Sequence, residues 1–243
     1  MHRAFALVSS TVALTIALSW AGGAAADPPN IKGSFGFTGT AACLVAPGNV
    51  PGATPLPNPT PGVALPNSGF NANLQPNDIN PGPTSSYTRS FSVEGVRTFN
   101  GDGTGTVKGT AVGIVGRPTP GPTGFPHFPP SASAADFSFS FTYTVNPDGS
   151  WTSAMTPGTY TETFTAGPRT GQTATVDAIP PQSGVISRDG ETLIAAHLAP
   201  MVETHSYSNG DVDPQICHRS RVLLRLRDDN DHDHDGDNDG DRH

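Results

Sequence analysis

The residues of this chain that could bind a metal gather at its C-terminus. Five aspartates stand there at alternate positions: Asp231, Asp233, Asp235, Asp237 and Asp239. Carboxylates at this spacing open the loops that hold calcium, a hard cation that prefers oxygen ligands. An EF-hand would continue to a bidentate glutamate at its twelfth position, where this chain has Arg242. The segment therefore predicts weak calcium binding at most, with a solvated acidic tail as the alternative.

A stripe of arginines comes just before that tail. Arg219 and Arg221 fall on the same face of an extended strand as Cys217. If this face points inward, the guanidinium groups would form an anion-binding site, because their planar fork matches a carboxylate or a phosphate. The alternative is that the stripe is the solvated outer face of the strand.

Residues suited to catalysis are few. Glu203 and His205 stand two positions apart on one strand face, where they could act as an acid–base pair, but polar strands produce this spacing by chance. The chain has no Gly-x-Ser-x-Gly motif, no His-Glu-x-x-His motif and no glycine-rich phosphate loop beside a helix. We therefore predict no catalytic residues, and no cofactor other than weakly bound calcium.

The two cysteines suggest a disulfide. Cys43 and Cys217 are the only cysteines, and oxidising compartments favour their pairing. A bridge that closes so long a loop would contribute about 4–5 kcal/mol on the chain-entropy model. Two separate buried thiols are the alternative.

The N-terminus predicts export. A basic start at Arg3 precedes an apolar run over 4–18 and small residues over 24–26, which is the order of a secretory signal peptide cleaved after residue 26. A retained membrane anchor is the alternative, but the run is short for a membrane span. We expect a secreted or periplasmic protein without a membrane span. The net charge of −8 argues against nucleic acid as a partner.

Composition divides the exported chain into one folded domain and three unusual segments. Proline is concentrated in 46–86 and 117–133, and proline cannot donate to the ladder of a central strand. Residues 228–243 are rich in aspartate with no apolar residue to bury, which predicts a disordered tail. Only 14% of the chain is charged, which disfavours helical bundles. We predict one β-domain over 27–227, with the proline-rich segments as insertions.

Residues between these segments alternate with the period of β-strands. Aromatic residues alternate with Ser and Thr over 137–145, and apolar residues and glycines alternate similarly over 31–43. Turn signals separate the runs, as at 146–149. This pattern predicts an all-β, antiparallel, up-and-down barrel of about 8–10 strands, closed so that no edge is exposed. In such a meander both proline-rich insertions leave from the same mouth.

Closure would make the first and last strands neighbours and place the Cys43–Cys217 bridge at the seam. One detail conflicts with this arrangement. Cys43 lies on the aromatic face of its strand, whereas Cys217 shares a face with the arginines, and paired residues must lie on one face. Either a bulge separates Cys217 from Val222, or the arginines point inward. We prefer the bulge.

Three stretches resemble known proteins: 31–37 after the signal peptide, then 99–105, then 141–149. They resemble a group of uncharacterised secreted bacterial proteins that look like small calycin-type, or lipocalin-like, barrels. The likeness covers most of the core but neither the proline-rich insertions nor the tail. It implies the barrel and the exported location, and it brings no catalytic residues.

The sequence thus predicts a non-enzymatic exported barrel that binds a small apolar or amphipathic ligand or acts at the cell envelope. An enzymatic alternative is a cyclase or isomerase like those on allene-oxide-cyclase-like barrels. A third is a structural or surface-interaction protein whose barrel is filled with side chains. The interior distinguishes them: a roomy apolar lumen favours binding, and a buried carboxylate that faces a Tyr or His favours catalysis.

Overall fold

The computed structural model describes residues 31–46, 69–71, 73–76, 86–116 and 131–227. The predicted signal peptide and most of the proline-rich insertions lie outside these ranges, as do the aspartates predicted to bind calcium, Asp231, Asp233, Asp235, Asp237 and Asp239. The described residues form eleven strands in one antiparallel sheet. They include no helix with the length and hydropathy needed to cross a membrane.

Five of the strands are long and six are short. The long strands are β1 (Lys32–Val45), β2 (Tyr87–Asn100), β3 (Thr104–Gly116), β4 (Ser131–Val145) and β11 (Val212–Arg225). The short strands are β5 (Ser150–Met155), β6 (Thr161–Ala166), β7 (Thr173–Val176), β8 (Gln182–Ile186), β9 (Thr192–His197) and β10 (Val202–Tyr207). Of the segments predicted as proline-rich, the second ends earlier than expected, since β4 begins at Ser131.

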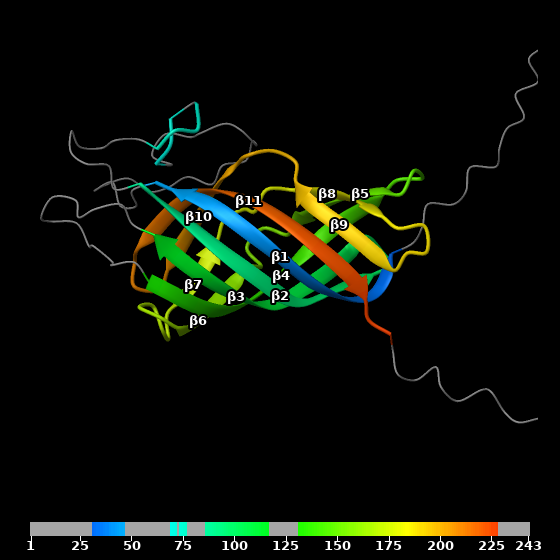
Figure 1. Ribbon diagram of the computed structural model, residues 1–243, viewed down its shortest axis with the longest axis horizontal. Helices are drawn as coiled ribbons and strands as arrows, with labels where there is room; N and C mark the ends of the chain where they lie inside the picture. Colours follow the sequence, from blue (N-terminus) through cyan, green and yellow to red (C-terminus); the bar gives the residue numbers. More distant parts are fainter. Residues whose placement is uncertain (1–30, 47–68, 72, 77–85, 117–130, 228–243) are drawn as a thin grey trace, which may run out of the picture.

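The sheet closes into a ring because β1 pairs with both β2 and β11. From β1 to β4 the strands follow one another as a meander. Two separate sets of short strands connect β4 with β11. Strands β5, β8 and β9 connect them at one end of the ring, and β6, β7 and β10 connect them at the other (Figure 1). The prediction of about 8–10 strands in a simple up-and-down order was therefore wrong. Strands β4 and β11 are long enough for each to pair with two short strands, an arrangement that local sequence patterns do not reveal.

The two ends of the ring differ. Short turns join β2 to β3, β4 to β5 and β8 to β9 at one end, which we call the turn end. The strand ends that bound both proline-rich insertions lie together at the other end, which we call the proline end. This agrees with the predicted strand parity. One described piece of the first insertion, around Phe70, is buried against Ala46 and Val202 at the proline end.

The predicted aromatic faces of 31–43 and 137–145 point into the ring. At the turn end, the buried Phe99 ring meets four others edge to face, with centroid distances of 5.0–6.0 Å. These rings belong to Phe35, Phe141, Tyr143 and Trp151. Such contacts add stability beyond the apolar area that they bury. Aromatic side chains therefore fill the turn end.

The seam between β1 and β11 is continuous. Cys43 pairs with Cys217, and the register runs on without a shift to Gly39 opposite Arg221. The preferred bulge between Cys217 and Val222 was therefore wrong, and the arginine stripe faces inward. Val222 lies on the outer surface with 45% of its area exposed. Arginine is usually solvated, but here the interior supplies a carboxylate partner and a cavity, which makes the inward face acceptable.

Candidate functional site

A cavity of about 100 Å³ lies inside the ring and reaches toward the proline end. Its aromatic lining consists of Phe37, Phe91, Phe137, Phe139, Phe141, Tyr160 and Phe164. The rings of Phe137, Phe139 and Tyr160 are stacked on one another, with centroids 5.9–6.4 Å apart and planes within 22°. This stacked wall offers a flat apolar surface to a planar ligand.

Charged side chains share the cavity lining with these rings: Arg89, Arg97, Arg219, Arg221, Glu162 and His205. They come from four strands, β2, β6, β10 and β11, and all line the same cavity. Four guanidinium groups face one carboxylate. The lining is therefore positively charged, although the whole chain carries a net charge of −8.

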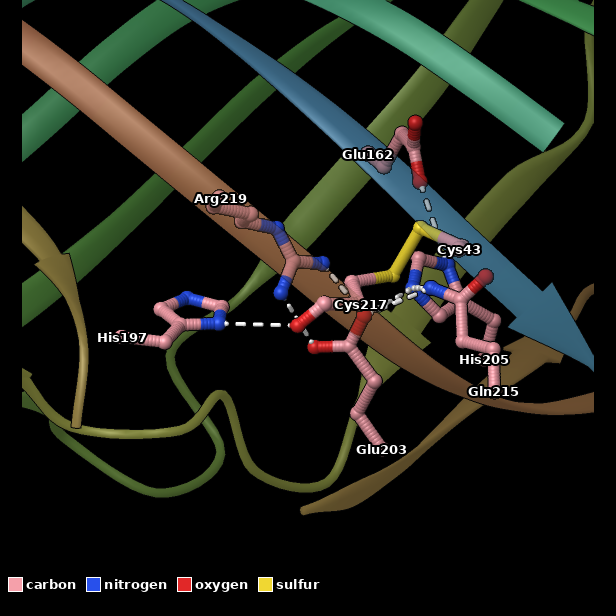
Figure 2. Close-up of a disulfide and its surroundings, with 8 residues drawn as sticks. All are labelled: Cys43, Glu162, His197, Glu203, His205, Gln215, Cys217 and Arg219. Atoms are coloured by element: carbon pink, nitrogen blue, oxygen red, sulfur yellow. Dashed lines mark hydrogen bonds and ion pairs between the residues drawn. A yellow bond between two sulfur atoms is a disulfide. The ribbon is translucent and has the colours of Figure 1, made fainter. Parts of the chain in front are cut away.

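Arg219 is neutralised by a carboxylate behind the cavity wall. Its Nη1 donates to Oε2 of Glu203 at 2.8 Å, and its Nη2 donates to Oε1 of the same carboxylate (Figure 2). Burial favours a raised pKa for Glu203, but the charge and hydrogen bonds of Arg219 prevail and the pKa is lowered. Glu203 is 1% exposed and stays ionised in this buried pair.

A buried glutamine connects this pair to a histidine. The amide Nε2 of Gln215 donates to Oε1 of Glu203 and to Nε2 of His205, both at 2.7 Å (Figure 2). Because an amide NH₂ group can only donate, the ring nitrogen Nε2 of His205 accepts. In the neutral ring the proton of His205 then sits on Nδ1.

That Nδ1 faces a second carboxylate. It lies 3.6 Å from Oε2 of Glu162, on β6 (Figure 2). Burial favours a raised pKa for Glu162, but the neighbouring His205 and the charge of Arg89 lower it. Glu162 is therefore an ionised carboxylate on the cavity wall, next to His205.

The hydrogen-bond acceptors described for Arg97 are neutral. It donates to Oγ of Ser153 at 2.7 Å and to Oε1 of Gln182 at 3.1 Å, and its guanidinium lies 3.9 Å from the centre of the Phe141 ring. Its Nε is buried without an acceptor. Burial, and then repulsion from Arg221, lowers the pKa of Arg97 to about 9.

Arg221 is another cation of the cavity lining. Its described hydrogen bond is a long one, 3.4 Å from Nη1 to the backbone oxygen of Ser220. Burial, and then repulsion from Arg219, lowers the pKa of Arg221 to about 10. Among the described residues, no carboxylate forms an ion pair with Arg97 or Arg221.

The structure places the residues singled out in the sequence in different surroundings. The Cys43–Cys217 disulfide is confirmed. Arg219 and Arg221 both line the cavity, but Arg219 is already bound by Glu203. Glu203 and His205 do lie close, with 4.0 Å between Oε1 and Nε2, yet Glu203 stands outside the cavity lining.

Sequence reasoning did not identify Arg97, Arg89 or Glu162 as site residues. They come from β2 and β6, and the distance along the chain hides their proximity to β11. One signal was present: each shares the alternate positions of an apolar face, Arg97 with Phe99 and Glu162 with Phe164. Charged residues at inward positions of a closed sheet are functional candidates.

The described residues hold one group whose atoms could approach a metal together. The sulfurs of Cys43 and Cys217 lie within 4.8 Å of a carboxylate oxygen of Glu203. These sulfurs are joined in the disulfide, and the carboxylate holds Arg219. Thiolates are the metal ligands of cysteine, so the oxidised site does not suit a metal.

Comparisons of the chain with protein-family models, with curated proteins and with solved structures give no match.

Proposed function

We propose that this protein is an exported, non-enzymatic binding protein that holds a small planar molecule in the lumen of a calycin-type barrel. The observation that carries the proposal is the cavity beside the stacked wall of Phe137, Phe139 and Tyr160. The aromatic cluster around Phe99 fills the turn end but leaves this space free. A completely filled barrel, the structural alternative, is therefore less well supported.

The size of the cavity restricts the ligand. A dry apolar cavity of about 150 Å³ holds benzene, and the cavity in this lumen is smaller, at about 100 Å³, so it limits the ligand to a single ring at most. The buried disulfide supports the proposed export, because disulfides persist in oxidising compartments.

The test uses two variants of adjacent residues on β3. Ala111 lines the cavity, whereas Val112 points outward with 51% of its area exposed. Ala111→Phe fills the cavity, and Val112→Phe adds the same ring outside it. Ligand-observed NMR with toluene, benzyl alcohol and benzamide should detect binding to the wild type and to Val112→Phe, and none to Ala111→Phe. Equal binding to all three proteins would place the fragments on the surface and overturn the proposal.

The enzymatic alternative has one specific observation in its favour. The ionised Glu162 and the neighbouring His205 line the same cavity as Tyr160. In an isomerase, Glu162 would accept a proton from carbon beside a carbonyl group and return it elsewhere on the substrate. Proton NMR of phenylpyruvate in D₂O tests this: deuterium exchange beyond the buffer rate that is lost in Glu162→Gln would make the protein an enzyme.

A further inference from the structure

We propose that the lumen selects an anionic ligand, a small aryl carboxylate whose carboxylate group is bound by Arg97 and Arg221. This inference rests on the proposed binding function and names the chemical class of the ligand.

The cavity wall carries more positive than negative charge. Glu203 neutralises Arg219 through two hydrogen bonds. Arg89 lies in the same lining as Glu162, and the two charges attract each other, although no described ion pair joins them. Arg97 and Arg221 remain, and the acceptors described for them are neutral. Arg97 is buried and Arg221 is half-buried, and buried charges in proteins are normally paired, so two inward guanidinium groups without a counter-ion among the described residues are suited to an anion from outside the chain.

Arg97 and Arg221 also lie where they could share one anion. Arg97 and Arg221 flank β1 from its two neighbours, with Arg97 opposite Phe35 and Arg221 opposite Gly39. Gly39 makes room for the guanidinium, because a Cβ at that position would lie 2.7 Å from Nη1 of Arg221. The two cations are close enough to repel each other. One carboxylate between them would relieve that repulsion.

Arg97 and Arg221 also have N–H donors that no described hydrogen bond uses. Arg97 is 4% exposed, and its buried Nε has no acceptor. Arg221 uses one of its donors, in a bond of 3.4 Å. A guanidinium group has five N–H donors in a fork that fits a carboxylate. The unused donors match the two oxygens of one carboxylate.

The aromatic rings of the cavity indicate the chemistry of the rest of the ligand. The cavity that Arg97 and Arg221 line is also lined by the stacked rings of Phe137, Phe139 and Tyr160. A ligand with one aromatic ring and one carboxylate uses both features. Inorganic phosphate would use only the cations, so comparison with phosphate separates an aryl carboxylate site from a general anion site.

The experiment compares three probes at pH 7 by titration calorimetry: benzoate, its neutral isostere benzamide, and inorganic phosphate. We expect wild-type protein to bind benzoate at least about tenfold more tightly than benzamide, since charge-assisted hydrogen bonds are the stronger ones. Phosphate should bind more weakly than benzoate. Arg221→Met should abolish the preference for benzoate, and Arg227→Met, which removes an exposed arginine after β11, should keep it.

Each outcome is decisive. Benzoate and benzamide binding equally well would overturn the anionic class and leave the proposed binding function in place. No binding of either aromatic probe would refute the proposed function itself. Phosphate binding as tightly as benzoate would overturn the aryl class. If Arg221→Met does not fold, the wild-type comparison still decides, and Arg221→Lys should retain part of the preference.

Discussion

Cys43 and Cys217 are paired directly across the seam between β1 and β11 and joined by a disulfide, although 174 positions separate them in the chain. The bridge connects the first and last strands of the ring, and so removes much of the freedom of the unfolded chain. A double variant, Cys43→Ala with Cys217→Ala, should lose about 4–5 kcal/mol of unfolding free energy. Urea-induced unfolding measures this, and a loss below about 1 kcal/mol would contradict the role of the seam.

The same substitution should affect stability differently at Arg219 and at Arg221. Arg219→Met leaves the buried carboxylate of Glu203 without its cation, which should cost about 3–5 kcal/mol of stability. Arg221→Met removes a cation that has no acidic partner among the described residues, so its stability should stay within about 1 kcal/mol of the wild type or rise. Chemical unfolding of both variants tests the charge assignment. Similar losses in the two would show that it is incorrect.

His197 should make stability depend on pH above the range where carboxylates titrate. Burial, and then the charge of Arg219, lowers the pKa of His197 to about 4, from 6.5 in the unfolded chain. Since the unfolded chain takes up the proton first, stability is fully present above pH 6.5 and falls as the pH drops toward 4. Between pH 7 and pH 5 the loss should be about 2 kcal/mol.

Two substitutions isolate this effect. His197→Gln should remove the loss between pH 7 and pH 5, while His218→Gln, at an exposed position of β11, should keep it. Urea unfolding at several pH values provides the measurement. A wild-type stability that is flat over this range would mean that His197 titrates normally in the folded protein.

The aromatic cluster at the turn end should dominate the stability of the core. Phe99 is 1% exposed and meets four rings. Phe99→Ala should therefore cost about 3–5 kcal/mol. Val96→Ala, at an outward position of the same strand with 39% exposure, should change stability by less than about 0.5 kcal/mol. Thermal unfolding of the pair would refute the assignment of the core if the two costs were comparable.

Much of the fold could be predicted from period-two alternation. The inward faces of 31–43 and 137–145, the closure of the ring and the disulfide at its seam all follow from apolar spacing and from the position of two cysteines. The two sets of short strands between β4 and β11 could not be predicted, because they depend on which short strand pairs with which half of each long strand. That pairing is a long-range choice without a local signal.

The site was predicted less well, for a definite physical reason. Treating Arg219 and Arg221 as solvated led to an expected bulge, since burying arginine is costly without a partner. The partner, Glu203, was visible in the sequence, but its register opposite β11 was not. Arg97 and Glu162 join the same cavity only because the ring closes.

The location of benzoate in the folded protein tests the central claim most directly. A crystal structure of the protein soaked with benzoate should show the ring against Phe137 and Phe139, and the carboxylate within hydrogen-bond distance of Arg97 and Arg221. Benzoate found only on the outer surface, or a lumen that side chains occupy completely, would contradict the account.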